Sequence, residues 1–357
     1  MAFVNGVLFV DAPASALNNA GMDAGQFADN KVLVKRIISD DGAYPYVSAQ
    51  AFRYWLRTVL EKDDSLEWRA APVHREQKIA YTDANPIEWW DDDLFGYMRA
   101  PKKGGKEVPL PTDIEANVSL TRVSPFRVGT LVSIAPVSIV TDWGTMTRHE
   151  GDPVPHEHEF YRAILKGLFS LDISSCGVFW TSARTGFKNL DKIRIGEAER
   201  RGLERRTLNG VDVFVLSTEE RARRVSSLLK GLARLQGGAK LTLHYTDVTP
   251  VVVLVAVTRG GNHIFNYVLG PKPGKSYQLQ VNEDALREVF EVYRNDIFSA
   301  VYAGWASGFQ DEEKEKTYTL LKKVFGENKV VTGHPRAVLE RLADDVKERA
   351  EEWFALE

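Results

Sequence analysis

The sequence contains very little cysteine and no long apolar run. Cys176 is the single cysteine in 357 residues, which excludes an internal disulfide framework and a cysteine-rich zinc site. The longest apolar run, Pro250 to Val257, has the length of a strand and is far too short to cross a membrane. The first residues, MAFVNGVLFVDAPAS, lack the basic start and apolar core of a signal peptide, so we expect a cytoplasmic protein.

Familiar catalytic signatures are also missing. The sequence has no GxSxG, Walker or GxGxxG motif and no kinase-type signature. Two acidic or histidine-rich clusters remain as candidates for metal chemistry. Asp91–Asp93 suit Mg²⁺ in a nuclease, but the flanking aromatic residues also fit a segment that docks by its side chains. His149, His156 and His158 suit zinc, but also a polar hairpin tip. We expect no metal and no cofactor.

The charge is unevenly distributed. The formal net charge of -3 argues against a nucleic-acid partner. However, residues 181–240 hold 14 Lys and Arg against 7 Asp and Glu, whereas residues 311–357 hold 9 against 12. This asymmetry suggests a basic binding face, although such runs more often mark a solvated helix face.

The order of predicted elements indicates an α+β protein. Strand-like segments surround an early helix, and further helices are expected over 218–235, 284–306 and 335–354. The segment KLTLHYTDVTPVVVLVAVTRGG predicts one or two more strands. Residues 63–117 are rich in proline and poorly periodic, which indicates an insertion into a core. Residues 141–161 have a turn cluster between two polar arms, as in a projecting hairpin. We expect a ferredoxin-like core with large insertions.

The stretch YPYVSAQAFRYWLRTVL, residues 44–60, predicts a helix with one apolar face. Ser48 is placed to cap the start of this helix, and Val47 and Phe52 have the spacing of a hydrophobic staple. The apolar face is formed by Phe52, Trp55, Leu56, Val59 and Leu60.

The opposite face of this helix carries Gln50, Arg53 and Arg57 near its positive end, where the helix dipole favours Asp or Glu. Free backbone N–H groups together with these side chains would form a site for a phosphodiester backbone. Alternatively, Arg53 and Arg57 pair with carboxylates of the 61–93 segment. The residues alone leave both possibilities open.

Several segments of the sequence resemble the DevR family of CRISPR-associated proteins. They cover most of the first 260 residues in the family's order: VDAPASALNNAG (10–21), VKRI followed by YPYVSAQAFRYWLR (34–57), DDDLFGYM (91–98), SLTRVSPFRVGTLVS (119–133) and EHEFYRAILKGLFSLDI (157–173). This family provides the multi-copy backbone subunit of type I Cascade complexes in antiviral defence, and the match looks closest to type I-B.

The resemblance implies a hand-like architecture. Residues 1–61, 118–140 and 161–357 would form an RRM-like (ferredoxin-like) palm that ends in C-terminal helices. Residues 62–117 would form a large fingers insertion, and residues 141–160 a thumb β-hairpin.

The resemblance also implies a set of RNA-binding residues. Lys35, Ser48, Gln50 and Arg53 would hold guide phosphates, with Arg57 one turn deeper on the same face. Trp143 or Met146 would act as a wedge against a base step. Asn18 and Asn19 would hydrogen-bond the guide backbone or the next subunit, with structural capping as the alternative. A glycine-rich contact of the wider superfamily corresponds here only to Gly237-Gly238 or Gly260-Gly261.

The implied partners are a CRISPR RNA, target DNA that pairs with the guide, further copies of the chain in a helical filament, and the large, small and 5′-handle-capping subunits of Cascade. The type I backbone subunit has no catalytic role, so we expect no intrinsic nuclease activity. A metal-dependent ribonuclease or RNA-processing enzyme that uses Asp91–Asp93 is the alternative.

Overall fold

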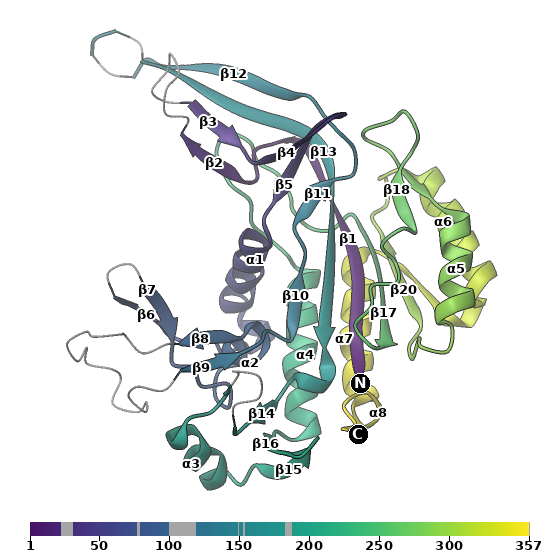
Figure 1. Cartoon of the computed structure of the whole chain (residues 1–357). Helices are drawn as coiled ribbons and strands as arrows, with labels where there is room; N and C mark the ends of the chain where they lie inside the picture. Colours follow the sequence, from purple (N-terminus) through teal and green to yellow (C-terminus); the bar gives the residue numbers. More distant parts are fainter. Residues whose placement is uncertain are drawn as a thin grey trace.

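The computed structural model describes residues 1–22, 31–76, 79–99, 119–148, 150–152, 154–182 and 188–356. Its centre is a large mixed sheet, with 12 strands among these residues. Figure 1 shows this sheet running through the middle of the molecule. Its main path has the order β21 (Val330–Gly333), β20 (Val301–Trp305), β17 (Val252–Arg259), β1 (Ala2–Ser15), β13 (Val154–Asp172), β11 (Leu131–Ser133), β5 (Gly42–Val47) and β4 (Arg36–Ser39).

Four strands lie off this path. β10 (Phe126–Val128) and β12 (Ile139–Met146) pair antiparallel with β13, β3 (Lys31–Val34) pairs parallel with it, and β2 (Asn19–Met22) pairs with β3. The strand β13 therefore connects most of the sheet. The first residues of β13 pair with β12, and its last residues pair with β1.

Helices cover both faces of the sheet, and the alternation of side chains along β1 and β17 explains why. Val4, Leu8 and Val10 face one core, and Val7 and Phe9 face the other. The first core contains α1 (Ala49–Lys62), α4 (Thr218–Ala233), α7 (Pro335–Glu348) and α8 (Ala350–Trp353). The second contains α5 (Glu283–Tyr293), α6 (Asp311–Phe325) and the ribbon of β18 (Leu269–Pro271) and β19 (Leu279–Val281). The expected α+β class is confirmed.

The helix α1 forms as its sequence predicts. Ser48 caps it by accepting a hydrogen bond from the amide of Ala51 at 3.3 Å. Its predicted apolar face, Phe52, Trp55, Leu56, Val59 and Leu60, is buried in the first core.

The expected projecting hairpin is confirmed over β12 and the first part of β13. The two strands pair from Ile139 with Tyr161 to Met146 with Val154. Figure 1 shows the hairpin extending away from the rest of the sheet.

A second lobe lies at the other end of the molecule (Figure 1). It contains the described part of the predicted fingers insertion 62–117, since residues 77–78 and 100–117 lie outside the described residues. Residues 178–182 and 188–215 also belong to this lobe, because Ile87 packs with Phe179, Leu190 and Phe214. Its elements are β6 (Val73–Glu76), β7 (Ile79–Thr82), α2 (Trp90–Phe95), β8 (Tyr97–Arg99), β9 (Leu120–Arg122), β14 (Val178–Trp180), α3 (Lys192–Arg200), β15 (Glu204–Leu208) and β16 (Val211–Val215).

One local expectation differs from the structure, and the expectation of one or two strands over 240–261 is met by one. The helix expected over 284–306 ends at Tyr293, and the buried VYAGW segment forms β20 because it pairs with β17. The segment KLTLHYT forms a turn, with Leu241, Leu243 and Tyr245 exposed, so only β17 forms from the strand pattern over 240–261. The helix expected over 335–354 is present, with a break at Arg349.

Candidate nucleic-acid interface

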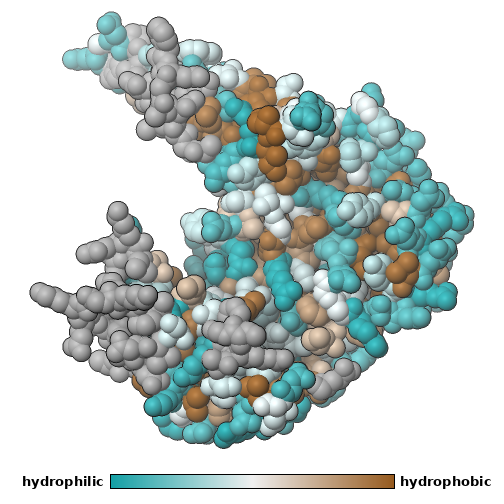
Figure 2. All heavy atoms as spheres, viewed as in Figure 1, coloured by the Kyte–Doolittle hydropathy of each residue, from teal (hydrophilic) through white to brown (hydrophobic). Residues whose placement is uncertain are grey.

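A deep concavity opens between the β12–β13 hairpin and the second lobe, as Figure 2 shows. The helix α1 lies between these two parts, with its N-terminal end toward the hairpin and the β2–β3 pair (Figure 1). Four of the predicted RNA-binding residues, Ser48, Gln50, Arg53 and Arg57, belong to this helix or its N-cap.

Three of the predicted RNA-binding residues, Asn18, Lys35 and Ser48, come together at the start of α1. The Lys35 amide donates to the Asn18 carbonyl at 2.9 Å, and the Asn18 side-chain amide donates to Ser48 Oγ at 3.3 Å. These bonds connect the end of β1, the β3–β4 junction and the cap of α1, although the residues are up to 30 positions apart in the chain. The hydrogen bond from Asn18 to Ser48 therefore supports the alternative in which Asn18 has a structural capping role.

Groups at the same place remain available to a ligand. Among the described residues, no carboxylate pairs with the half-buried Lys35, and Gln50 is exposed in the first turn of α1. The first turn of a helix also presents amides that have no acceptor within the helix. Beside it, Asn19 Oδ1 is buried without a hydrogen-bond partner. This corner of the concavity thus combines a cation, an amide side chain and free backbone donors, as a phosphate requires.

Arg53 lies on the same face of α1, but its guanidinium points into the protein. It donates to the carbonyls of Phe95 at 2.6 Å and Phe126 at 2.7 Å, and to Ser124 Oγ at 3.1 Å. Its Cζ also lies 5.0 Å from the centre of the Phe95 ring. Burial, together with the charge of nearby Arg57, lowers the pKa of Arg53 to about 10. Arg53 connects α1 to the segments around residues 95 and 125.

Arg57 pairs with Asp91, as the alternative interpretation of the sequence expected. Its Nε lies 3.1 Å from Asp91 Oδ2, and its Cζ lies 4.2 Å from the centre of the Phe95 ring. The carboxylate of Asp91 is buried, and this burial raises its pKa despite the cation.

The other two acidic residues of this run are buried in α2. Asp92 accepts hydrogen bonds from Thr82 Oγ1 at 2.5 Å and from the Asn85 amide at 2.8 Å, and burial raises its pKa to about 6. Asp93 pairs with Arg122 and with Arg224, the latter at 2.9 Å. Trp90, Leu94 and Phe95 are also buried, so this segment docks by its aromatic residues within the chain. Each carboxylate is satisfied by donors of the protein.

The predicted wedge residues lie exposed on β12. Trp143 is 65% exposed and Met146 59%. Because side chains alternate along a strand, the two lie on opposite faces of the hairpin. Only one of them therefore points toward any strand that passes along a given face.

Two of the hairpin histidines, His156 and His158, lie close together. His149 lies outside the described residues. The His156 and His158 rings are 4.7 Å apart, and His158 Nδ1 lies 3.0 Å from Lys240 Nζ. Burial and the Lys240 charge lower the pKa of His158. In the part of the chain that the structure describes, no group of three or more His, Cys, Asp or Glu side chains is arranged to hold a metal ion.

The two glycine pairs lie at opposite ends of the sheet. Gly237 and Gly238 follow α4 and have positive φ angles, and a Cβ on Gly237 would lie 2.3 Å from the Trp55 ring of α1. The Gly260 carbonyl instead accepts a bond from Asn5, near the first residue of the chain. The pair at 237–238 is therefore the one that adjoins α1.

Most of the described arginines of the basic 181–240 segment are either buried or paired with carboxylates. Arg221 and Arg224 of α4 are buried, and Arg205, Arg223 and Arg234 pair with carboxylates. The basic face suggested by composition is therefore not an open surface over these residues. Across the described helices, none is long and apolar enough to cross a membrane.

Comparison with known proteins gives the family. The model of a family described as CRISPR-associated negative auto-regulator DevR/Csa2 matches residues 10–269. The chain belongs to this family. The predicted membership is thus confirmed, and residues 270–357 lie beyond the part that the family model matches.

Solved structures share the fold of this DevR/Csa2-family chain. A chain of a "CRISPR RNA-guided surveillance complex" matches with a TM-score of 0.52 and 11% identity over 96% of this chain and 99% of that chain. A chain of a "CRISPR RNA-guided surveillance complex, pre-nicking" matches with a TM-score of 0.53 and 12% identity over the same shares. No curated protein matches the sequence.

Proposed function

We propose that the protein is a non-catalytic subunit that binds CRISPR RNA, stacks in multiple copies along the guide spacer and presents it for pairing with target DNA in a type I Cascade complex. The observation that carries this proposal is the corner at the start of α1. There, three separate segments are joined by hydrogen bonds, while Lys35 has no carboxylate partner among the described residues and Gln50 is exposed.

These groups suit the backbone of a single strand. Cations and amides bind phosphates without reading base edges, so the bases stay free to pair with a second strand. The projecting hairpin adds the exposed side chains of Trp143 and Met146, one on each of its faces. In this proposal one of them inserts at a base step, as apolar side chains do in other nucleic-acid complexes.

The strand order supports an RRM-like palm. β17, β1, β13 and β11 are consecutive in the sheet and antiparallel, with α1 and α4 in the same core. Numbered along the chain as strands 1 to 4, they have the spatial order 4-1-3-2. With the helices in place, this is the β-α-β-β-α-β arrangement of ferredoxin-like domains.

The alternative of a metal-dependent nuclease at Asp91–Asp93 is less well supported. A metal site requires carboxylate oxygens that are free to coordinate, whereas Asp92 and Asp93 are buried and accept hydrogen bonds from the protein. Assembly with copies of itself and with the large, small and 5′-handle-capping subunits, in the cytoplasm, is part of the proposal.

Co-purification tests the proposal. The chain is expressed with its guide array, passed over a size-exclusion column, and the absorbance ratio and extracted RNA are analysed. We expect a large assembly with RNA of uniform, spacer-derived length. A monomer without RNA would refute the proposal. Metal-dependent cleavage of target RNA, abolished by Asp93→Asn in a protein that still folds, would favour the nuclease.

A further inference from the structure

A second surface rich in cations lies on the face of the sheet opposite α1. Along β13, Leu165 and Phe169 pack in the core that contains α1, whereas Ile164 packs in the other core. Because side chains alternate along a strand, Arg162, Lys166 and Leu168 lie on the same side as Ile164, away from α1. This side of β13 is open to solvent in two adjoining hollows.

Three segments line both hollows, and Asp41 and Gly42 also line the first. Phe160 and Arg162 of β13 line the first, of about 620 Å³, and Lys166 and Leu168 line the second, of about 310 Å³. Residues 130–140 form one wall of both hollows, and residues 266–277 form the other. Together they make one groove along the strand, which we call the β13 groove.

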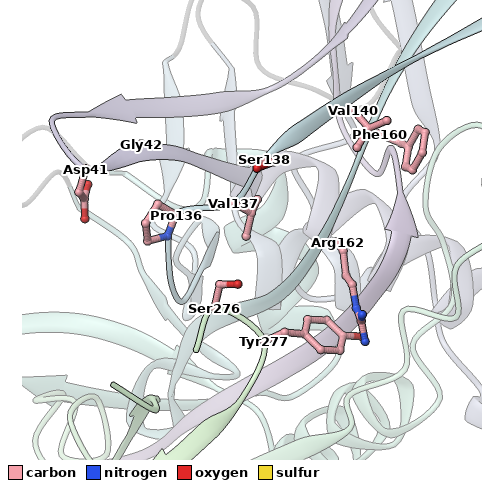
Figure 3. Close-up of a pocket in the computed structure, with 10 residues that line it drawn as sticks. All are labelled: Asp41, Gly42, Pro136, Val137, Ser138, Val140, Phe160, Arg162, Ser276 and Tyr277. Carbon is pink, nitrogen blue, oxygen red and sulfur yellow. The ribbon is translucent and has the colours of Figure 1, made fainter. Parts of the chain in front are cut away.

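The first hollow contains a flat, positively charged platform. The Arg162 guanidinium lies 3.9 Å from the centre of the Tyr277 ring, and Figure 3 shows the two side chains lying together. The Tyr277 hydroxyl donates to Asp11, which fixes the ring. Phe160 lies farther along the same hollow (Figure 3). A guanidinium stacked on an aromatic ring presents a plane on which a nucleobase can stack.

The cations of the groove lack partners of opposite charge. Lys166 is half-buried, and its ammonium donates to the carbonyls of Asn266 and Leu269. Lys272 and Lys275 are exposed in the turn of the wall, between Pro271 and Ser276. Within the described residues, no carboxylate pairs with Arg162, Lys166, Lys272 or Lys275. The acid that lines the groove is Asp41 at one end, which accepts a bond from Tyr44 at 2.6 Å. A half-buried ammonium without a counter-ion is costly unless an anion joins it.

We propose that the β13 groove binds single-stranded nucleic acid at a site separate from the guide contacts at α1. Phosphates of that strand contact Lys166, Lys272 and Lys275, and a base stacks on the Arg162–Tyr277 platform. The inference rests on the proposed function only for the statement that the guide lies at α1. Most of one wall, residues 270–277, lies beyond the family match, so the groove is not covered by the family model.

Fluorescence anisotropy of the full-length protein with a fluorescein-labelled thymidine oligonucleotide tests the groove. We expect Lys272→Ala/Lys275→Ala to weaken binding by about fivefold to tenfold, and to reduce the salt dependence of log K by roughly 0.7 per lysine. The double variant Lys323→Ala/Lys329→Ala removes the same charge from exposed positions of α6 and the following turn, and should bind as the unchanged protein does. Equal weakening in both double variants would reduce the effect to general electrostatics and overturn the proposal.

The platform has its own test. We expect Arg162→Ala, which removes the cation stacked on the Tyr277 ring, to bind the oligonucleotide several-fold more weakly than the unchanged protein does. An oligonucleotide carrying iodo-deoxyuridine should crosslink to Tyr277 or Phe160 on irradiation, as mapped by mass spectrometry. Crosslinks confined to α1, Trp143 and Met146, with none at Tyr277 or Phe160, would overturn the proposal.

Two further outcomes distinguish this site from other assignments. The amount of RNA retained during purification should be unchanged in Lys272→Ala/Lys275→Ala. Loss of this RNA would mean that the guide itself passes through the β13 groove, so that the groove is not a separate site. Binding of labelled polyglutamate, with no binding of the oligonucleotide, would assign the groove to an acidic peptide. If no RNA co-purifies with the unchanged protein, the guide proposal fails while the oligonucleotide assay still measures the groove.

Discussion

The second lobe and the β13 groove both carry several cations, but they use them differently. At the junction of the lobe with α4, Arg122 and Arg224 surround the buried Asp93. In the groove, Arg162, Lys272 and Lys275 face solvent, and none pairs with a carboxylate among the described residues. In the basic 181–240 segment, Arg221 and Arg224 are therefore buried in the fold, and several other arginines form surface ion pairs. Counting charges along a chain does not locate a binding surface, because the partners of each charge decide whether it remains available.

The largest effect is expected from the junction. Asp93→Asn leaves Arg122 and Arg224 without a full counter-charge in the interior, which should lower the free energy of unfolding by about 3–5 kcal/mol. Urea titration monitored by tryptophan fluorescence measures this change in the free energy of unfolding. The control Asp212→Asn breaks the exposed pair with Arg205 and should leave stability nearly unchanged. Similar losses in both variants would mean that burial does not distinguish the two regions.

The pH dependence of stability also tests how burial of a charged group in the second lobe affects folding. Burial, with smaller contributions from Asp91 and Asp83, raises the pKa of Asp92 to about 6 from 3.8. Asp92 therefore ionises more easily in the unfolded chain, and its ionisation should remove up to about 3 kcal/mol of stability as the pH rises from about 4 to 6. Asp92→Asn should lack this decline. Urea titrations of both proteins across this range give the comparison, and parallel curves would contradict the assignment.

Arg53 offers a test of structure against binding on α1 itself. Arg53→Lys keeps the charge but cannot serve the Phe95 and Phe126 carbonyls together, so we expect a loss of about 1–3 kcal/mol in stability. RNA retention, measured by absorbance ratio after purification, should stay close to that of the unchanged protein. If Arg53→Lys has unchanged stability but retains less RNA, Arg53 contacts the RNA, as the resemblance predicts.

A smaller effect is expected at the open corner of the concavity. Lys35→Ala should weaken guide retention by roughly fivefold and reduce its salt dependence by about one ion, because one phosphate contact is lost. Thermal unfolding should be nearly unchanged. Lys329→Ala removes an exposed lysine elsewhere and serves as the matched control. Unaltered retention in Lys35→Ala would remove this corner from the RNA path.

The smallest effect on stability is expected from Trp143→Ala, within about 0.5 kcal/mol, because the side chain is 65% exposed. The same change should abolish any periodic chemical reactivity of bases along the bound guide. Met146→Ala, on the other face of the hairpin, is the comparison. Periodic reactivity that survives in Trp143→Ala but disappears in Met146→Ala would assign the wedge to Met146.

Local signals in the sequence predicted α1 well. The cap, the staple and the apolar face of residues 48–60 all concern neighbours within a few positions, so the sequence contains what decides them. The hairpin and the family resemblance also concern contiguous segments. The partners of Arg53 could not be predicted in the same way. They are carbonyls and a hydroxyl near residues 95 and 125, and their meeting with α1 depends on the tertiary fold.

Long-range pairing decides two places where the local pattern is a poor guide. Residues 301–305 were assigned to a helix because a helical pattern precedes them, yet pairing with β17 makes them a strand. Residues 241–245 have strand-like alternation, but no strand pairs with them, and Lys240 and His244 pack against the hairpin. The β13 groove likewise joins residues 130–140, 160–168 and 266–277, and no local pattern indicates that they meet. Long-range pairing overrides local preference at each of these places.

The strand β13 runs for 19 residues without interruption and belongs to both the hairpin and the core of the sheet. Its first part pairs with β12, its middle forms the floor of the groove, and its last part pairs with β1 down to Asp172. A hydrogen-bonded strand resists stretching along its axis. A pull on the hairpin tip would therefore be transmitted along one continuous backbone to the groove and be shared as shear across the ladder with β1. The single strand β13 therefore couples the hairpin mechanically to the groove and to β1.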